Sequence, residues 1–211
     1  AYGVARQAMT QSATMEMRSI AKLKQAQIEQ WLHERHDELR LIITSQLALG
    51  LKQWLDGGMH DEDLRTSLHN HLIYLGSQRE RALGLRSATD GRQLLGTTPY
   101  QDLPQVRALA LEAASRCELT LEDIHVAEGK TSSGFEVGLF GPVCDPGSTD
   151  RDRSLAVIQL SFDPGERLFP LPQMWPGSSP SAETQVVRME GEALVFLNPL
   201  RHAAQPPLAL R

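Results

Sequence analysis

Several features that would point to a special class of protein are missing from the sequence. Two cysteines are too few for a small fold held together by disulfides. No run approaches the roughly 18 consecutive apolar residues that a membrane-spanning helix requires. Basic charge is not in excess, because 21 lysine and arginine residues stand against 26 aspartate and glutamate residues. A nucleic-acid-binding protein needs a basic surface to displace phosphate counterions, so we expect no nucleic-acid partner.

What remains is the composition of an ordinary globular protein. Hydrophobic residues make up 41% and charged residues 22% of the 211 positions, which excludes wholesale disorder. This length allows one large domain, or one domain and part of a second. The chain starts at Ala1 and not at methionine, so we expect its natural start to be missing. Removal of a membrane anchor and ordinary processing would both produce such a start.

The first part of the chain predicts one or two long helices. No proline and only two glycines occur between Tyr2 and Leu55. Apolar residues recur at steps of three and four and predict one buried stripe, whereas charged residues such as Lys24, Arg35 and Glu38 are expected to be mostly exposed. The first twenty residues are rich in alanine, methionine and glutamine, which suits a projecting helix that packs against its own copy in a homodimer. The stripe consists of Ile20, Leu23, Ile28, Trp31, Leu32, Leu39, Ile42, Ile43 and Leu47.

Beyond the glycines at 57 and 58, which are expected to end the helix, the pattern predicts a mixed domain. A further helix is expected over 61–75, and a hairpin over 82–95 is built on the Asp90-Gly91 turn. Pro104 predicts the first turn of a helix that runs to Cys117. Strands are expected over 120–127, 135–143 and 154–162. Because short loops join them, these strands should pair antiparallel, and the fold class is α+β.

The end of the chain combines a stiff segment with another hairpin. Four of the twelve prolines fall within residues 165–180, which we interpret as a connector. Residues 184–197 then read as strand, tight turn and strand. This arrangement is similar to the opening of a second copy of the same sheet.

This order of elements resembles the extracytoplasmic double Cache family of sensor domains, whose lobes have a PAS-like fold. The closer resemblance is to the periplasmic regions of bacterial sensor histidine kinases and diguanylate cyclases. The stretches that carry it are IEQWLHER at 28–35, LFPLPQMWP at 168–176, and SAET at 181–184 followed by VFLNPLRH at 195–202.

The resemblance implies both an architecture and a function. It implies a long N-terminal helix (1–58), a membrane-distal PAS-like (Cache) lobe (59–164), a connector (165–180) and a partial, truncated membrane-proximal lobe (181–211). It also implies a periplasmic ligand-sensing region without catalytic activity or cofactor, anchored in the inner membrane by segments absent here. Output would come from a cytoplasmic kinase or diguanylate cyclase. The residue constellation of amino-acid-binding members cannot be placed on residues 98–140, so amino-acid sensing is not predicted.

Four polar residues interrupt the apolar strands and are the candidates for binding a small molecule. They are Arg86, His125, Glu136 and Gln159. Buried polar groups must be hydrogen-bonded, either to one another or to a ligand. The alternative interpretation is that these residues lie on the solvated face of a half-buried sheet.

The sequence gives weaker signals for metal binding and for a disulfide. The histidine pairs at 33 and 36 and at 69 and 71 lack an evident third ligand, so no metal site is predicted. Cys117 and Cys144 could form a disulfide in an oxidising periplasm. We favour two separate small apolar residues, because a helix end and a strand end need not lie within bonding distance.

Two other classes of function remain open. One is a ligand-free dimerisation or protein-interaction module with the sensor fold, which an exposed apolar stripe on the first helix would favour. The other is a secreted hydrolase, which a deep pocket converging on a histidine and a carboxylate would favour.

Overall fold

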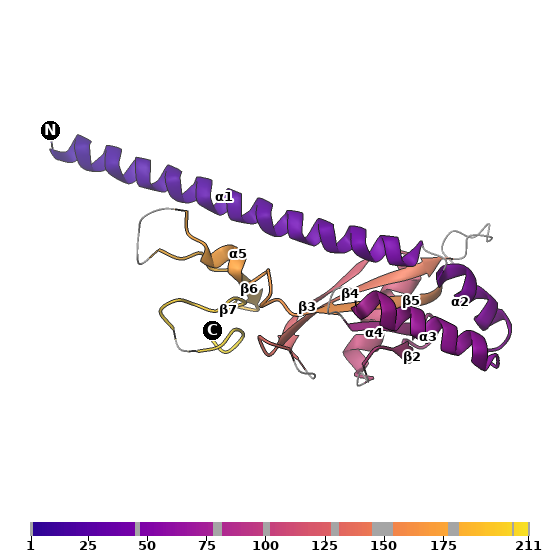
Figure 1. Cartoon of the computed structure of the whole chain (residues 1–211). Coiled ribbons are helices and arrows are strands. Elements are labelled where there is room, and N and C mark those ends of the chain that lie inside the picture. Colours follow the sequence, from indigo (N-terminus) through magenta and orange to yellow (C-terminus); the bar gives the residue numbers. More distant parts are fainter. Residues whose placement is uncertain are drawn as a thin grey trace. The chain divides into compact units, whose positions relative to one another are not determined.

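The structure is a computed structural model, and it describes residues 2–44, 47–77, 82–98, 102–127, 131–144, 154–176, 182–203 and 205–210. The chain divides into two units. One unit comprises Ala1–His33 and Gly165–Arg211, and the other comprises Glu34–Pro164. Helix α1 (Tyr2–Ile43) contributes residues to both units (Figure 1).

Two helices occupy the predicted helical segment. Helix α1 is followed by α2 (Leu47–Asp56), which ends where the glycines were expected to end it. Gly58 adopts the left-handed conformation with φ +68°, which glycine takes without steric cost. Helix α3 (Glu62–Ser77) follows, and it is preceded by Asp61, whose Oδ1 accepts the backbone N–H of Leu64 at 2.9 Å.

One face of α1 is buried from Ile20 onward, but it is not purely apolar. Lys24, Arg35 and Glu38 are only 4%, 7% and 9% exposed, so the prediction that these residues face water is wrong. Partners one turn away explain how the charges are accommodated. An Nη1 of Arg35 lies 3.1 Å from Oε2 of Glu38, and Lys24 Nζ donates to Gln27 at 3.3 Å. Burial lowers the pKa of the Lys24 ammonium group.

The Glu34–Pro164 unit is built on an antiparallel sheet in the order β2-β1-β5-β4-β3. The strands are β1 (Ala82–Ser87), β2 (Gln93–Gly96), β3 (Thr120–Val126), β4 (Phe135–Cys144) and β5 (Ser154–Phe162), and α4 (Pro104–Arg116) lies between β2 and β3 in the sequence. The predicted hairpin, helix and three further strands are therefore confirmed, as is the α+β class. Antiparallel pairing places β1 beside β5 although they are far apart in the sequence.

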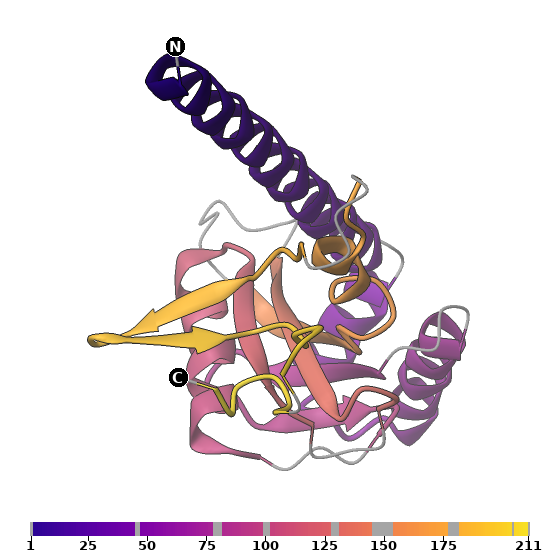
Figure 2. The same cartoon turned by 90° about the vertical axis from the view of Figure 1, so that its left-hand side faces the viewer.

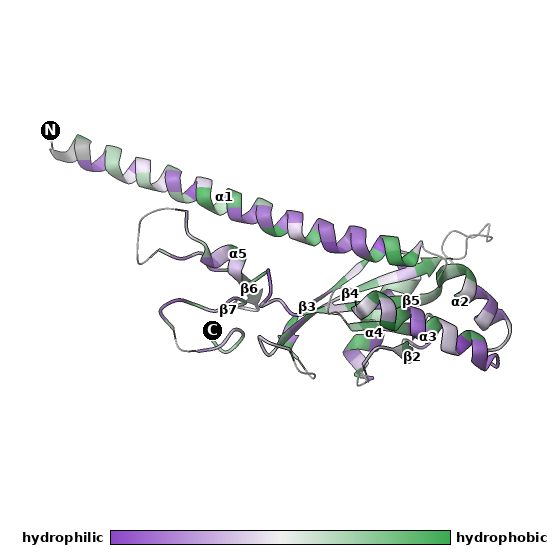
Figure 3. Ribbon diagram, viewed as in Figure 1, coloured by the Kyte–Doolittle hydropathy of each residue, from purple (hydrophilic) through white to green (hydrophobic). Residues whose placement is uncertain are grey.

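The two faces of this sheet differ in chemistry. On one face, which we call the apolar face, Leu83, Leu139, Ile158 and Leu160 are at most 1% exposed. The hydrophobic end of α1 packs on this face (Figure 3), since a Cβ added to Gly141 would lie 2.9 Å from the Leu39 side chain. Helix α4 packs on the opposite face. Its residues Val106, Ala110, Ala113 and Ala114 form a cluster with Phe140 of β4 and Val157 of β5.

The C-terminal hairpin is also confirmed. Within the connector, the short helix α5 (Pro170–Gln173) precedes β6 (Val187–Glu190) and β7 (Ala193–Phe196), which pair antiparallel (Figure 2). The hairpin is tied to the residues around it. Asn198 Oδ1 accepts the N–H of Val186 at 2.6 Å, and the carbonyl of Phe196 accepts the N–H of Leu208 at 2.8 Å.

Candidate functional site

All four candidate residues lie on the α4 side of the sheet. Directly opposed residues of neighbouring strands point to the same side, and alternate residues of one strand share a face. The pairs that establish this placement are Arg86–Val157, Gln159–Phe140 and Glu136–His125. We call this side of the sheet the polar face. It also carries Glu122, Gly138 and Ser161.

Three of the candidates are buried. Arg86 is 0% exposed, Gln159 is 2% exposed and Glu136 is 9% exposed. The alternative of a solvated sheet face is therefore wrong for these residues. His125 is half-buried, with 37% of its side chain exposed. Buried polar side chains on a sheet face require partners, and their partners define what each can do.

Arg86 is held by several elements at once. Its Nε donates to Oε1 of Gln159 at 2.7 Å, and its Nη1 donates to the carbonyl of Gly91 and to Oδ1 of Asp102, each at 3.0 Å. Gln159 in turn lies 3.4 Å from Ser161 Oγ. The guanidinium thus connects β1, β5, the β1–β2 turn and the residues before α4. These hydrogen bonds fix the position of the Arg86 side chain on the polar face.

Asp102 secures the start of α4. Its carboxylate accepts hydrogen bonds from Arg86, from the backbone N–H of Gln93 at 3.1 Å and from Nη2 of Arg107 at 3.2 Å. Burial raises the pKa of the Asp102 carboxyl, but the hydrogen bonds from Gln93, Arg86 and Arg107 outweigh it and leave the pKa below its usual value. Asp102 is therefore an ionised anchor between the sheet and α4.

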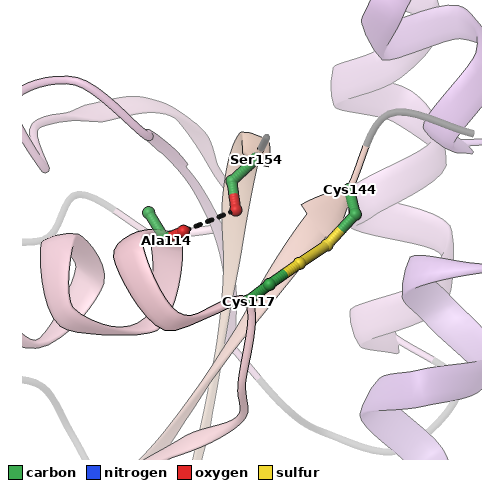
Figure 4. Close-up of a disulfide and its surroundings, with 4 residues drawn as sticks. All are labelled: Ala114, Cys117, Cys144 and Ser154. Atoms are coloured by element: carbon green, nitrogen blue, oxygen red, sulfur yellow. Dashed lines mark hydrogen bonds between the residues drawn. A yellow bond between two sulfur atoms is a disulfide. The ribbon is translucent and has the colours of Figure 1, made fainter. Parts of the chain in front are cut away.

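A disulfide secures the other end of α4. Cys117 caps the helix in the left-handed conformation, and its sulfur is bonded to that of Cys144 at the end of β4 (Figure 4). Nearby, Ser154 Oγ donates to the carbonyl of Ala114 at 2.8 Å. The interpretation that the two cysteines are separate apolar residues is wrong, because α4 lies across β4 and brings its end to the end of that strand. Helix α4 is thus attached to the sheet at both ends.

The remaining part of the polar face is acidic. Glu122 lies opposite Gly138 and His125 lies opposite Glu136, with a register shift between Glu122 and His125. This irregularity puts both side chains of β3 on the polar face, where His125 Nδ1 is 4.0 Å from Oε1 of Glu122. A side chain at Gly138 would collide with the Glu122 carboxylate, so the glycine leaves room for this group.

Two residues of this site were not predicted. They are Glu122 and Asp102. Glu122 lies three positions before the predicted His125, so simple alternation puts these two side chains on opposite faces of the sheet, and only recognition of a bulge would have corrected this. Asp102 lies in a connecting segment without periodicity. The available signal was an acidic residue just before a helix whose first turn is marked by Pro104.

Metal chemistry finds no support in the described residues. In these ranges no group of three or more histidine, cysteine, aspartate or glutamate side chains could hold a metal ion. His69 instead lies with Nε2 3.0 Å from the carbonyl of Gly96, and His33 with Nδ1 2.8 Å from that of Glu29. Among the described helices, none combines the length and hydropathy needed to cross a bilayer.

Comparison with known proteins gives matches among solved structures. No family model matches the sequence, and no curated protein matches it significantly. The sensory domain of the Campylobacter jejuni chemoreceptor Tlp3 with isoleucine bound is 13% identical, with a TM-score of 0.57 over 78% of this chain and 64% of that chain. The ligand-binding domain of Tlp3 in complex with L-valine is 13% identical, with a TM-score of 0.56 over 78% and 65%. Its complex with 4-methylisoleucine is 15% identical, with a TM-score of 0.55 over 75% and 61%.

These matches define the class of fold. The long N-terminal helix followed by a five-stranded antiparallel sheet is a fold that this chain shares with these chemoreceptor sensory domains. The fold expected from the resemblance to Cache domains is thereby confirmed. The chain spans less than two thirds of the length of these structures, between 61% and 65%.

Proposed function

We propose that this chain is the extracytoplasmic ligand-sensing region of a transmembrane signal-transduction receptor, and that it binds a small molecule on the polar face. In this proposal residues 59–164 form the membrane-distal lobe and residues 181–211 begin the membrane-proximal one. The chain itself is not catalytic. Output belongs to a cytoplasmic histidine kinase or diguanylate cyclase.

The observation that carries the proposal is the burial of polar side chains on one sheet face. A sheet that serves only as a scaffold would fill a buried face with apolar groups, as the apolar face does. The polar face instead buries Arg86, Gln159 and Glu136 beside the small residues Gly138 and Ser161. Convergent polar groups on a buried surface are typical of small-molecule sites.

The attachment of α4 supplies a mechanism for signalling. A ligand that contacts both the sheet and α4 favours one packing of the helix on the sheet, and so shifts the population between two arrangements. The anchors at Asp102 and Cys117 limit this motion to a small displacement. The projecting part of α1 would transmit the change to a second copy in a homodimer.

The disulfide supports a location outside the cytoplasm. Disulfides persist in oxidising compartments such as the bacterial periplasm and are rare in the cytosol. Cys117 and Cys144 are bonded in the structure. We therefore place the chain on the periplasmic side of the inner membrane.

A thermal-shift screen of the chain tests the sensing function. The panel contains small organic acids, amines, amino acids, nucleobases and neutral polyols, with oligomeric state followed in parallel. A bound ligand raises the melting temperature in proportion to ln(1 + [L]/Kd). We expect the response to disappear in His125→Ala, because this half-buried side chain can be removed from the polar face at little cost to the fold.

His60→Ala is the matched control for this screen. His60 is exposed in the connection between α2 and α3, so its loss should leave ligand binding unchanged. A ligand response that is equal in both variants would contradict binding on the polar face. No response to any ligand, with a stable dimer throughout, would support the second candidate.

The second candidate is a ligand-free dimerisation module of the same kind of receptor. It is favoured by exposed apolar side chains near the start of α1. Val4, Met9, Met15 and Met17 are 73%, 76%, 56% and 57% exposed. A helix with such residues gains stability by packing on a copy of itself.

A further inference from the structure

Helix α4 is attached covalently to the sheet at its C-terminal end. Cys117 follows the last residue of α4, and its Sγ is bonded to that of Cys144, the last residue of β4 (Figure 4). Both cysteines are half-buried, so solvent reaches this end of the helix. Exposed disulfides are reduced more readily than buried ones. The attachment is therefore open to reductants in the folded chain.

The backbone at Cys117 has a conformation that a side chain disfavours. Its φ of +51° lies in the left-handed region. Glycine is the usual residue at such a position after a helix, because a Cβ atom is crowded there. A residue with a Cβ keeps this conformation where its surroundings hold it. The bond to Cys144 is a covalent constraint on this residue, so breaking the bond allows the backbone at Cys117 to relax.

Apart from the disulfide, this end of α4 is held by small contacts in the described part of the chain. Ala113 and Ala114 face the sheet, and alanine side chains bury little apolar area. Ser154 Oγ also donates to the carbonyl of Ala114 at 2.8 Å. Ser154 is the cross-strand partner of Cys144. The hydrogen bond and the disulfide thus hold α4 on the same pair of residues, at one end of β4 and β5.

The N-terminal end of α4 is attached independently of the cysteines. Asp102 accepts hydrogen bonds from Arg86, from Arg107 and from the backbone N–H of Gln93. The sheet is held by its own strand pairing and by burial of the apolar face. Loss of the disulfide would therefore free one end of the helix and leave the other end and the sheet in place.

We propose that the bond between Cys117 and Cys144 is a redox-sensitive clasp, which a dithiol reductant opens to release the C-terminal end of α4 from the sheet. One thiolate of the reductant attacks Cys117 Sγ, the bond between the two cysteines breaks, and Cys144 leaves as a thiolate that takes up a proton. The second thiolate of the reductant then attacks the mixed disulfide. The reductant becomes a cyclic disulfide and Cys117 is released as a thiol, so two electrons and two protons pass to the chain.

The clasp would control how α4 covers the polar face, and it does not depend on the sensing function proposed above. Helix α4 packs on Phe140 and Val157. These residues are the cross-strand neighbours of Gln159 and Arg86 on the polar face. Movement of α4 away from the sheet at Cys117 would open this part of the polar face to solvent, with or without a ligand.

NMR of the isotopically labelled chain at pH 7, with and without dithiothreitol, tests the clasp. In the oxidised chain we expect backbone order parameters of about 0.85 throughout α4. Reduction should lower those of residues 113–116 to below about 0.6 and move their Cα shifts towards the values of an unfolded chain. The signals of β1 and β2 should keep their positions. Replacing dithiothreitol by oxidised glutathione should restore the original spectrum.

Serine variants separate the clasp from the rest of the helix. The double variant Cys117→Ser and Cys144→Ser should resemble the reduced parent chain and should not respond to dithiothreitol. Ser154→Ala should leave α4 ordered in the oxidised chain and increase its disorder in the reduced one, because both attachments are then missing. Ser115→Ala is the matched control. Ser115 is exposed and its Oγ donates to the carbonyl of Glu112 in the same helix, so this variant should behave as the parent chain in both redox states.

Three results would overturn the inference. If residues 113–116 have the same order parameters in the oxidised and reduced chains, packing holds the helix without the disulfide. If the native signals of β1 disappear on reduction together with those of α4, the bond stabilises the whole fold and is not a clasp. If dithiothreitol reduces the bond only after a denaturant is added, the disulfide is closed to reductants in the folded chain. The ligand response in the thermal-shift screen is measured separately, so each of these results leaves the sensing function standing.

Discussion

The two faces of the five-stranded sheet are made by the same strands but carry different kinds of side chain. On the apolar face, Leu139, Ile158 and Leu160 are at most 1% exposed, and the end of α1 packs against the backbone at Gly141. On the polar face, the neighbouring positions are Gly138, Gln159 and Ser161. Each strand therefore contributes to stability with one set of alternate residues and to the candidate site with the other.

The difference also extends to how each face is covered. Burial of large apolar side chains holds the helix on the apolar face, at roughly 25 cal/mol for each Å² removed from water. Helix α4 brings mainly alanines to the polar face, which bury little area. It is held in addition by an ion pair at one end and a disulfide at the other. The polar face thus depends on specific attachments where the apolar face depends on packing.

The largest effect should follow removal of the disulfide. Replacing both Cys117 and Cys144 by serine opens a loop with a sequence separation of 27, for which the chain-entropy model gives a loss of about 3.5 kcal/mol in the free energy of unfolding. Urea unfolding at pH 7 measures this change. A reducing agent should have the same effect on the parent chain and none on the double variant. A loss below about 1 kcal/mol would mean that packing alone keeps α4 on the sheet.

The sequence predicts which residues lie on each face only where a strand or helix keeps its regular period. Alternation along β1, β4 and β5 was sufficient to select Arg86, Glu136 and Gln159, because a regular strand puts every second residue on one face. It failed at Glu122, where the register shift before His125 changes the side. Helical periodicity likewise located most of the buried stripe of α1, but Leu23, which was expected to be buried, is 49% exposed. It missed Lys24, Arg35 and Glu38, because a charged residue with a partner one turn away can occupy a buried position.

The attachments of α4 could not be predicted from local patterns. Cys117 and Cys144 meet only because α4 lies across β4, and Asp102 acts through contacts with Arg86 and Gln93 that come from other elements. Such contacts depend on the tertiary fold. No periodic signal in the sequence marks them.

The next largest effect on stability should come from replacing one of two glycines of β4 by alanine. Gly141 and Gly138 lie on opposite faces of β4, and each would place an added Cβ against a different neighbour. Gly141→Ala pushes against Leu39 and Ile43 in a packed core, so we expect a loss of about 1–3 kcal/mol in the free energy of unfolding. Gly138→Ala meets the Glu122 side chain, whose carboxylate can move. It should cost less stability and displace a group of the candidate site.

Measuring both variants by urea unfolding and by ligand titration sharpens the comparison. Gly141→Ala should lower stability and leave the affinity of the folded chain unchanged for a ligand found in the thermal-shift screen. Gly138→Ala should weaken binding severalfold with a smaller loss of stability. The reverse pattern would show that the functional surface has been assigned to the wrong face.

The smallest effect is a dependence of stability on pH through Asp102. Because its pKa is lower in the folded chain than in the unfolded one, the unfolded state binds the proton more readily. The stabilisation is fully present above the unfolded pKa of about 3.9 and is lost as the pH falls through the folded pKa. Asp102→Asn should therefore be less stable than the parent chain at pH 7, and this difference should narrow below about pH 4.

Urea unfolding of Asp102→Asn between pH 7 and pH 3 checks this expectation, with Asp37→Asn as the control. Asp37 is exposed on α1, so its substitution should not change the pH profile. A constant difference between Asp102→Asn and the parent chain across this range would mean that Asp102 contributes hydrogen bonds but no charge. In that case a group other than Asp102 would compensate the charge of the buried Arg86 guanidinium.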